Sequence, residues 1–386
     1  MKIGGRFDLT YCSNIHAGES WGEVRAALGA ALPAIRRELG HAGPFAIGLR
    51  LSARAADELN RTAILEEFRG FLRDGGYYVP TINGFPYGAF HRERVKENVY
   101  LPDWREPARV EYSNVLAALL STFLADAGLT DGSVSTVPGA FKREIRSEAD
   151  VRLMARNIID HVRYLAALRE RTGVTVVLAI EPEPACYIET VDEAIDFFSR
   201  YLFQSSTVPI DHVRRHAGVC FDTCHMAVEF EDAQSALRRL ETAGIRVPKF
   251  QISSALRVPR PAEGSPGRTA LATFADATYL HQVVEQRAGQ LSRFVDLPEA
   301  LSTAGCTDCE WRIHFHVPVF LPAMGVLDTT QGDLIKALDV IKERDEPACL
   351  EVETYTWDVL PAQYKTVNMH TAIARELAWV RTQLTA

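Results

Sequence analysis

The sequence predicts a single (β/α)₈ barrel formed by residues 1–386. Short apolar runs rich in β-branched residues alternate with longer amphipathic segments along the whole chain, the pattern of βα units around a parallel sheet. Eight such units can be counted, which favours a closed barrel over an open doubly wound sheet. No G-x-G-x-x-G motif follows the first strand, so a Rossmann fold is the weaker alternative.

The individual elements follow from these runs. Strands are expected at Phe7–Cys12, Phe45–Leu51, Tyr78–Ile82, Ser133–Val137, Val174–Ile180, Gly218–Phe221, Lys249–Ile252 and Cys349–Val352. Apolar residues at three- and four-residue spacing predict helices at Glu23–Leu39, Glu58–Arg73, Val110–Ala127, Ala149–Arg171, Val191–Tyr201, Ala233–Ala243, Asp333–Glu343 and His370–Leu384. Each helix would lay its apolar stripe on the sheet.

The stretch 256–311 breaks this rhythm. It is far longer than a usual βα loop and opens with the Pro/Gly/Arg-rich sequence RVPRPAEGSPGR. We therefore expect a long insertion after the seventh strand, at the active face of the barrel. The following run, Trp311–Phe320, is strand-like and is interpreted either as a ninth strand that extends the seventh or as an alternative barrel member.

The composition is that of an ordinary globular protein, with 47% hydrophobic and 24% charged residues. The net charge is −8 and no dense Lys/Arg stripe is present, so nucleic acid is not an expected partner. The chain shows no apolar run of signal-peptide length at its start and no window of about 18 apolar residues, which predicts a cytoplasmic protein without a membrane span. The oligomeric state is left open.

The seven cysteines are an odd number and are spread through the chain, unlike a secreted disulfide framework. We interpret them mostly as reduced thiols. Cys306 and Cys309 form an isolated C-x-x-C pair, whereas a structural zinc site usually needs two such pairs or added histidines. A loop contact is the preferred interpretation of this pair, and metal binding or redox chemistry is the alternative.

Polar side chains close four of the expected strands, where the active site of such a barrel lies. Glu181 follows VVLAI, Asp222 follows GVCF, Gln251 lies in KFQIS and Glu351 in CLEVE. Three acids on one rim repel one another unless a cation is present. We therefore predict one or possibly two divalent ions. The oxygen ligands suit Mn²⁺, Mg²⁺ or Co²⁺, and nearby histidines shift the preference toward Mn²⁺ or Zn²⁺.

Each acid also has a simpler interpretation, because a carboxylate at a strand end can cap the next helix or pair with an arginine. Glu183 lies two residues beyond Glu181, and Glu353 two beyond Glu351. Strand alternation puts both members of a pair on one face, so the choice of ligand within each pair stays open. We prefer the inner members, which fall closest to the strand body.

Histidines extend the candidate site. His314 and His316 are two residues apart and point the same way, which predicts substrate contact for His314 and metal ligation for His316, with hydrogen bonding in a core as the alternative. His225 is interpreted as a substrate contact that is either a proton carrier or a further ligand.

The first and third strands lead into rim segments that carry His16 and Asn83. Both are expected to contact the substrate. An Asx turn at Asn83 is the simpler alternative.

The spacing of these residues resembles a known family. Glu181, Asp222 with His225 three later, a polar residue at 251 with Arg257 six later, and Glu351 are similar to the ladder of the xylose isomerase-like TIM barrel superfamily, which includes sugar epimerases, inositol-pathway isomerases and endonuclease IV. More narrowly, TYCSNIHAGESW, YLHQVVE and HFHVPVF resemble the EboE-type metabolite traffic proteins of ebo gene clusters.

The resemblance implies roles for these residues. Glu181 and Glu351 would ligate the ion and act as the acid/base pair on opposite faces of the substrate carbon. Asp222 and Gln251 would complete the ligand set, and Arg257 would steady a substrate oxygen. Sugar epimerases of the superfamily usually have His at the position of Gln251, a departure that changes the metal preference. The His-x-His is similar to the extra ligands of polynuclear members.

Three functions fit these expectations. The first is a metal-dependent isomerase or epimerase that acts on a small sugar, sugar phosphate or cyclitol by proton abstraction next to a carbonyl. The second is metal-assisted hydrolysis of a phosphoester, favoured if two or three ions bind through His225, His314 and His316. The third is a non-catalytic metabolite-binding protein of a biosynthetic or export pathway.

Overall fold

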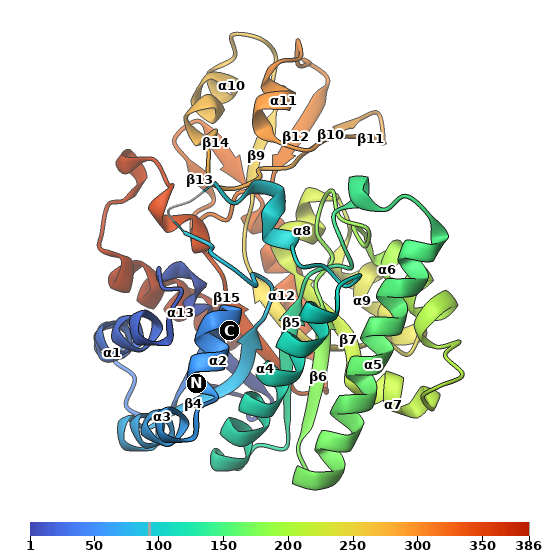
Figure 1. The fold of residues 1–386 in the computed structure, drawn as a ribbon. Coiled ribbons are helices and arrows are strands. Elements are labelled where there is room, and N and C mark those ends of the chain that lie inside the picture. The colour runs from blue at the N-terminus through green and yellow to red at the C-terminus, as the bar shows by residue number, and fades with distance from the viewer. Residues whose placement is uncertain (92–93, 386) are drawn as a thin grey trace.

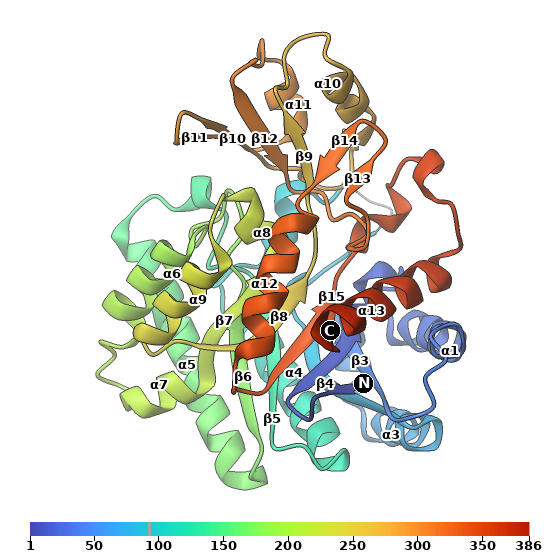
Figure 2. The same ribbon diagram turned by 180° about the vertical axis from the view of Figure 1, so that it is seen from behind.

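The computed structural model describes residues 1–91 and 94–385 and shows a closed barrel of parallel strands surrounded by helices (Figures 1 and 2). Around the barrel the strands run in the order β2, β15, β8, β7, β6, β5, β4, β3. Their bounds are β2 (Phe7–Tyr11), β3 (Phe45–Arg50), β4 (Tyr77–Asn83), β5 (Asp131–Thr136), β6 (Thr175–Ile180), β7 (Ala217–Asp222), β8 (Arg246–Ile252) and β15 (Ala348–Val352). The predicted (β/α)₈ fold is confirmed.

The barrel closes between its first and second strands. Cys12 forms a parallel bridge with Gly48, just beyond the end of β2. The Thr10 hydroxyl replaces a ladder bond, since it donates to the Ala46 carbonyl at 2.8 Å and accepts from the Gly48 N–H at 2.8 Å. A short β1 (Lys2–Ile3) adds an antiparallel strand to β2. Every residue of β2, β3, β6, β7 and β15 is buried, which explains why these strands read as continuous apolar runs.

The outer helices begin where the sequence supplies caps. Ser20 and Glu23 form a capping box at the start of α1, and Thr190 and Glu193 form one at α6. The helices are α1 (Trp21–Glu38), α2 (Ala53–Leu59), α3 (Thr62–Gly75), α4 (Pro107–Asp126), α5 (Glu148–Thr172), α6 (Val191–Phe197), α7 (Ile210–His216), α8 (Thr223–Val228), α9 (Ala233–Thr242), α12 (Gln331–Glu343) and α13 (Met369–Thr385).

Two predicted helices differ in detail. The segment expected as one helix, Glu58–Arg73, covers the end of α2, which ends at Leu59, and most of α3, which starts at Thr62. The segment expected as Val191–Tyr201 is α-helical only to Phe197 and continues as a π turn. The short helices α7 and α8 were not predicted, since six or seven residues are too few to show a helical period.

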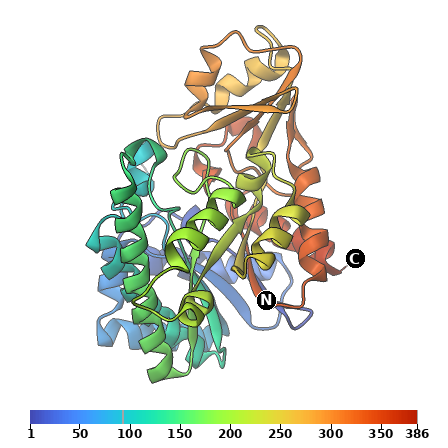
Figure 3. The ribbon, with the colours of Figure 1, turned by 90° about the vertical axis from the view of Figure 1, so that its right-hand side faces the viewer.

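The insertion after β8 folds as an antiparallel sheet at the carboxyl-terminal end of the barrel strands (Figures 1 and 3). Its order is β11, β10, β12, β9, β14, β13. The elements are β9 (Leu256–Pro259), α10 (Pro266–Leu271), β10 (Val283–Arg287), β11 (Gln290–Phe294), α11 (Leu297–Leu301), β12 (Cys309–Ile313), β13 (Ala323–Met324) and β14 (Leu327–Thr329). The sheet thus continues past residue 311, the expected end of the insertion.

The run Trp311–Phe320 is not a barrel strand. Only its first residues form β12, which pairs with β10 and β9 inside the insertion. The strand ends at Ile313, and the Val317 N–H then donates to the Ser254 carbonyl at 2.9 Å, next to the end of β8. Both interpretations of this run as a ninth strand or barrel member are therefore wrong.

No helix within residues 1–91 and 94–385 combines the length and the apolar character needed to cross a membrane.

Gly48 offers a test of the barrel closure. A Cβ atom at this position would lie 2.0 Å from Glu351 Oε1 and 2.7 Å from the Tyr11 carbonyl oxygen. We expect Gly48→Ala to lower the free energy of unfolding by about 1–3 kcal/mol, because the core cannot absorb the methyl group. A Cβ atom added at Gly22 in α1 would have no neighbour within 4 Å, so Gly22→Ala should raise stability by about 0.5–1 kcal/mol. Urea unfolding of both variants measures this, and an unchanged Gly48→Ala midpoint would contradict it.

Candidate metal centre

Three carboxylates meet at the carboxyl-terminal end of the barrel. Glu181 follows β6, Asp222 ends β7, and Glu353 follows β15. All three side chains are buried, and one oxygen from each lies within 4.8 Å of the others. Three buried negative charges at this distance are costly unless protons or a cation neutralise them.

Two oxygens of these carboxylates have no hydrogen-bond partner that would offset their negative charge. Glu181 Oε2 and Asp222 Oδ2 are buried and make no hydrogen bond within the described part of the chain. Burial, followed by the charges of Glu353 and Asp222, raises the pKa of Glu181 well above its usual range. Burial and the charges of Asp222 and Glu351 raise the pKa of Glu353 to about 8. A divalent cation fits this group, because it supplies the positive charge and a partner for the unpaired oxygens.

Asp222 combines the two roles that the sequence left open. Its Oδ1 caps α8 by accepting from the N–H groups of Cys224 at 2.7 Å and His225 at 3.0 Å, and it also accepts from the Ser253 hydroxyl at 2.6 Å. Its Oδ2 is the unpaired oxygen that faces the cluster. Helix capping therefore orients this carboxylate and does not compete with metal binding.

Three histidines direct the same ring nitrogen toward one point. His225 Nε2 lies 3.1 Å from His314 Nε2, which lies 3.2 Å from His316 Nε2. Burial, together with the neighbouring histidines, lowers the pKa of His314 well below its ordinary value. Burial also lowers the pKa of His316 to about 4. The rings of His314 and His316 are thus neutral near pH 7.

The opposite ring nitrogens fix the tautomers. His225 Nδ1 lies 2.8 Å from the Pro182 carbonyl, and His316 Nδ1 lies 2.9 Å from the Glu353 carbonyl. A carbonyl only accepts, so each Nδ1 carries a hydrogen, and in the neutral form of the ring Nε2 then presents a lone pair. Lone pairs that face one another repel unless a metal ion accepts them. Histidines that bind a metal through one ring nitrogen usually donate a hydrogen bond from the other nitrogen, as His225 and His316 do here to backbone carbonyls.

Gln282 of the insertion fixes the third tautomer. Its amide nitrogen donates to the Pro184 carbonyl and to the Tyr100 hydroxyl, both at 3.0 Å. The amide oxygen is thereby turned toward His314 Nδ1, at 2.7 Å, and accepts its hydrogen. His314 Nε2 is left as a lone pair in the cluster.

The acid group and the histidine group are adjacent and share Asp222. Asp222 Oδ2 lies 3.7 Å from His225 Nε2 and 3.9 Å from His316 Nε2. Glu183, with His225 and His314, forms a further group whose ligand atoms lie within 4.8 Å of one another. The arrangement would supply donors for two neighbouring cations, with Asp222 belonging to both groups.

The structure places Glu351 and Gln251 outside these groups. Glu351 Oε2 pairs with Lys249 Nζ, and both side chains are fully buried. The Gln251 amide nitrogen, turned toward Glu351, donates to its carbonyl at 3.3 Å and to Oε2 at 3.2 Å. Within the described residues, Glu351 belongs to no group of three potential metal ligands. Glu351 is the inner member of its pair: its Oε2 is bound to Lys249, while its Oε1 is buried without a hydrogen bond in the described part of the chain. Glu353, the outer member, is the one whose oxygen lies within 4.8 Å of Glu181 and Asp222.

Of the expected substrate contacts, Asn83 lies at the centre and two others do not. Asn83 donates to Glu353 Oε1 at 3.2 Å, and its own Oδ1 accepts from the Phe85 N–H at 3.0 Å, so the Asx turn is present as well. Arg257 lies on β9 and pairs with Glu310 at 2.7 Å on the outer sheet. His16 lies against Tyr11, 3.1 Å from its hydroxyl, and lines a separate small cavity.

A pocket with a cavity volume of about 50 Å³ opens directly onto the carboxylates. Its polar wall includes Glu181, Glu183, His225 and Glu353, and its other walls are largely aromatic and aliphatic: Phe85, Pro86, Phe90, Val95, Val99, Tyr100, Tyr279, Leu280 and Tyr355. The ammonium of Lys96 reaches this wall but is already bound to Asp296 Oδ2 at 2.6 Å and to two carbonyls. The pocket thus combines carboxylates and a histidine, which can carry protons, with apolar walls that a ligand can pack against.

Several site residues were missed or undervalued from the sequence. Glu353 could have been found, since strand alternation already made it the partner of Glu351. Asn14, which donates to Glu353 Oε1 at 2.7 Å, follows the first strand directly but gives no stronger signal than that of a turn residue. Gln282 lies in the YLHQVVE motif, but no role could be assigned to it, because its contact with His314 is formed only when two separate strands of the insertion pair.

The comparisons with known proteins agree with this architecture. A family model described as xylose isomerase-like TIM barrel matches residues 42–267, and the chain belongs to this family. A solved xylose isomerase-like TIM barrel protein from Mycobacterium smegmatis, in complex with magnesium, is 14% identical with a TM-score of 0.54, covering 100% of this chain and 99% of that one.

Two further solved structures share the fold at a TM-score of 0.50. A xylose isomerase domain protein from Planctomyces limnophilus is 15% identical and covers 98% of this chain and 95% of its own. A D-psicose 3-epimerase, crystallised in the presence of D-fructose, is 13% identical and covers 99% and 100%. No functionally curated protein matches the chain. At these identities the likeness concerns the fold.

Glu353→Gln and Glu351→Gln separate the two glutamates. Glu353→Gln removes a charged ligand, so we expect metal affinity to fall at least about tenfold while the metal-free protein stays folded. Glu351→Gln leaves the buried Lys249 without its counter-charge, so we expect a loss of about 3–5 kcal/mol in stability. Equilibrium dialysis with elemental analysis and urea unfolding measure the two effects. A reversed pattern, with metal lost only in Glu351→Gln, would show that the inner glutamate is the ligand.

Glu376 on α13 connects two segments that carry residues of the candidate metal centre. Its Oε1 accepts from the Thr354 hydroxyl at 2.7 Å and from the Val319 N–H at 3.1 Å, and so joins the segments that follow Glu353 and His316. The side chain is only 2% exposed, and burial raises its pKa from 4.5 to about 7. Near neutral pH this carboxyl still holds a proton for part of the time.

The titration of Glu376 should appear in the stability of the fold. Because the folded pKa is the higher one, its contribution is fully present below about pH 4.5 and is lost as the pH rises through about 7, a change of about 3 kcal/mol. Glu376→Gln keeps the accepting oxygen and removes this term. The stability of the wild type relative to the variant should therefore fall between about pH 5 and pH 8 in urea unfolding. A constant difference across this range would contradict the assignment.

Proposed function

We propose that this chain is a divalent-metal-dependent isomerase or epimerase that acts on a small polyhydroxylated substrate such as a sugar, sugar phosphate or cyclitol. The observation that carries the proposal is the meeting of Glu181, Asp222 and Glu353 within 4.8 Å, with unpaired oxygens on Glu181 and Asp222. Glu181 and Glu353 also line the pocket. The family supports the choice of chemistry at the class level, and the substrate itself belongs to the proposal.

A divalent cation at this position supplies Lewis acidity to substrate oxygens. The protein supplies the proton carriers. Glu181 and Glu353 reach the pocket from β6 and β15, which are separated in the barrel by β7 and β8. We assign them to opposite ends of a proton transfer at the carbon next to the substrate carbonyl. This assignment replaces Glu351 with Glu353 as the second acid/base group.

The surroundings suit these roles. Asn14 and Asn83 both donate to Glu353 Oε1, which fixes the direction of that carboxylate. Asp222 is fixed through its capped Oδ1 and serves as a ligand through Oδ2. The aromatic wall formed by Phe90, Tyr279 and Tyr355 can pack against the apolar face of a sugar ring and exclude water. His225 lies in the same pocket and is placed to bind a substrate oxygen or a second ion.

Metal-assisted hydrolysis of a small phosphoester is a second candidate, and the histidine cluster favours it. The three Nε2 atoms of His225, His314 and His316, together with Asp222 Oδ2, provide donors for a second ion next to the first. Two cations bridged by a carboxylate are a recurrent hydrolytic arrangement. One ion per chain would favour isomerisation, and two or more would favour hydrolysis.

The non-catalytic alternative is weaker on the same geometry. A simple metabolite carrier does not require buried acids with unpaired oxygens beside the bound molecule. The narrower resemblance to the EboE-type proteins remains a prediction, since the family model covers residues 42–267 and does not distinguish this group. If it holds, the substrate is a metabolite of a biosynthetic or export pathway.

Solvent deuterium exchange tests the proposal without knowledge of the net reaction. Protein loaded with Mn²⁺, Co²⁺, Mg²⁺ or Zn²⁺ is incubated in D₂O with a panel of ketoses, ketose phosphates and inososes, and exchange at the carbon next to the carbonyl is followed by NMR. We expect Glu181→Gln and Glu353→Gln to slow exchange by about a hundredfold or more, as loss of a general acid or base does. Glu38→Gln on the exposed end of α1 is the matched control.

Two outcomes would overturn this proposal. Undiminished exchange in both site variants would remove Glu181 and Glu353 from the proton transfer. Phosphate release from a panel of small phosphoesters, with two ions per chain and no exchange on any carbonyl substrate, would replace the isomerase proposal with the hydrolase.

A further inference from the structure

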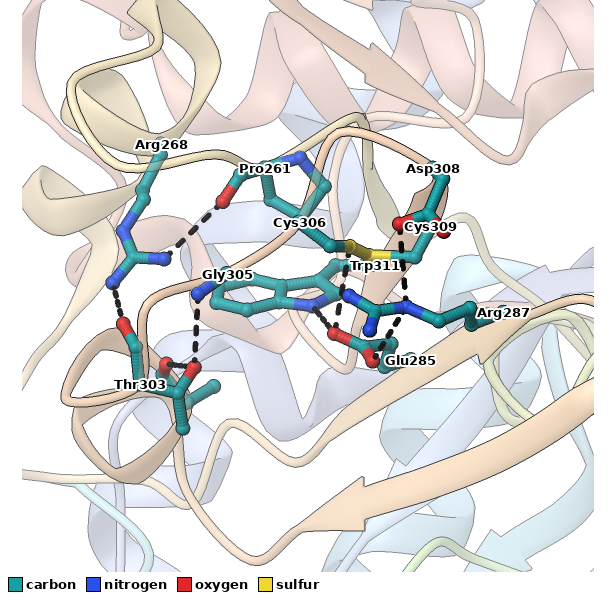
Figure 4. The surroundings of a disulfide bond; sticks show 11 residues. Pro261, Arg268, Glu285, Arg287, Thr303, Gly305, Cys306, Asp308, Cys309 and Trp311 are labelled. Atoms are coloured by element: carbon teal, nitrogen blue, oxygen red, sulfur yellow. Dashed lines mark hydrogen bonds and ion pairs between the residues drawn. A yellow bond between two sulfur atoms is a disulfide. The ribbon is translucent and has the colours of Figure 1, made fainter.

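The insertion carries a disulfide between Cys306 and Cys309, the one disulfide within the described residues (Figure 4). Cys309 opens β12, and Cys306 lies in the loop before it. The two Cα atoms are 5.8 Å apart, within the ordinary range for a disulfide. The bond is remote in the sequence from the residues assigned to the metal centre on the barrel strands, and the proposed function does not use it.

This disulfide contributes little to holding the insertion together. It closes a loop with only Thr307 and Asp308 between the cysteines, and the stabilisation from a disulfide is smallest for the shortest loops. β12 is already paired on both edges, with β10 and with β9. The remaining cysteines are buried and unpaired: Cys12, Cys186, Cys220, Cys224 and Cys349. The chain is therefore not a disulfide-stabilised fold, and a chemical role explains the pair better than a structural one.

A carboxylate makes the two sulfurs inequivalent. Glu285 Oε2 lies 3.7 Å from Cys306 Sγ, within hydrogen-bonding distance for sulfur, and no such bond to Cys309 is formed within the described residues. The indole N–H of Trp311 donates to the same oxygen at 2.7 Å and holds it beside the disulfide (Figure 4). Glu285 is thus positioned to take a proton from a Cys306 thiol or to return one.

The loop between the two cysteines lies at the surface. Thr307 and Asp308 are exposed, whereas Cys306 and Cys309 themselves are buried, at 6% and 7% exposure. The insertion projects from the end of the barrel (Figure 3), and a partner would approach the disulfide through these two exposed residues. Arg287 Nε lies 3.4 Å from Asp308 Oδ1 and 3.9 Å from Glu285 Oε1, so it links the loop between the cysteines to the carboxylate (Figure 4).

We propose that Cys306 and Cys309, assisted by Glu285, form a thiol–disulfide exchange site that is reduced and reoxidised by a dithiol partner. In reduction, a thiolate of the partner attacks Cys309 Sγ, the S–S bond breaks, and Cys306 leaves with the electron pair and takes up a proton. The partner's second thiolate attacks the mixed disulfide and releases Cys309, which also takes up a proton. The partner becomes a disulfide, and two electrons have moved to the cysteine pair.

The reverse direction assigns a function to the carboxylate. The Cys309 thiolate first attacks the partner's disulfide, which breaks, releases one partner thiolate and leaves the mixed disulfide. Glu285 then accepts the proton of the Cys306 thiol, and the resulting thiolate attacks Cys309 Sγ, breaks the mixed disulfide and releases the partner's second thiolate, so that the partner ends as a reduced dithiol. The thiolate, not the thiol, is the nucleophile, so a base beside Cys306 accelerates this step.

A redox titration of the folded, full-length protein tests the proposal. The protein is equilibrated without oxygen in buffers of graded reduced-to-oxidised glutathione ratio, alkylated, and mapped by peptide mass spectrometry. We expect the pair to pass from oxidised to reduced within the range that glutathione covers, whereas structural disulfides resist reduction by glutathione. A pair that stays oxidised in excess reduced glutathione overturns the proposal.

Variants test the part played by Glu285. Glu285→Gln should slow closure of the reduced pair by oxidised glutathione about tenfold near neutral pH, and Glu285→Asp should recover part of the rate. Glu310→Gln is the matched control, because Glu310 is the neighbour of Cys309 on β12 but pairs with Arg257 and Arg312. Equal closure rates in Glu285→Gln and Glu310→Gln would remove Glu285 from the mechanism.

The sulfur-ligand alternative has its own readout. Glu285, Cys306 and Cys309 place one ligand atom each within 4.8 Å, so the reduced pair could hold a thiophilic cation. If the reduced protein binds one equivalent of Zn²⁺ that Cys306→Ser/Cys309→Ser abolishes, and the bound pair no longer exchanges with glutathione, the site is a metal site and the exchange proposal fails.

Discussion

The buried ion pair between Lys249 and Glu351 governs the charge balance of the whole barrel mouth. Both side chains are fully buried, and Lys249 also donates to the Ser135 hydroxyl at 3.0 Å. Attraction to Lys249 moderates the rise in pKa of both Glu181 and Glu353. The ammonium group of Lys249 carries one positive charge and pairs with Glu351, the innermost of the four carboxylates. The other three acids, Glu181, Asp222 and Glu353, are therefore left with negative charge that Lys249 does not neutralise. This uncompensated negative charge is what makes the rim a candidate cation site.

The insertion completes the site and does not merely cover it. His314 follows directly on β12, and Gln282 precedes β10, so both reach the barrel mouth from the paired strands of the insertion. The hydrogen-bond acceptors that fix the three histidine rings come from both the barrel and the insertion: Pro182 after β6, Gln282 in the insertion, and Glu353 after β15. Because each anchor fixes one tautomer, three lone pairs converge. Metal binding and the docking of the insertion are therefore expected to stabilise each other.

Much of the fold could be predicted from local pattern. Five of the eight barrel strands are buried along their whole length, so apolar runs such as VVLAI in β6 located them directly. The longer helices were found by their period. The break between α2 and α3 was not, and most of the seven-residue helix α2 was missed, because so short a helix shows too little of the helical period. For the candidate site, alternation identified the pairs Glu181/Glu183 and Glu351/Glu353 but could not rank their members. Which member of a pair faces the candidate metal centre depends on its depth in the barrel and, for Glu351, on the ion pair with Lys249. Lys249 lies about a hundred positions from Glu351 in the sequence, and hydrophobic periodicity carries no information about contacts at that separation.

By itself, the sequence determined the (β/α)₈ class, the long insertion after the seventh barrel strand, and the residue types that gather at the strand ends. These follow from short-range constraints: hydrophobic period, helix caps and the alternation of side chains along a strand. Only the tertiary structure decided which polar residue faces which. It paired Glu351 with Lys249, brought Glu353 to Asp222, placed His314 beside His225, and left Arg257 on the outer sheet. The physical reason is that electrostatic partners are chosen by distance in space, which strand pairing and barrel closure set only after the chain has folded.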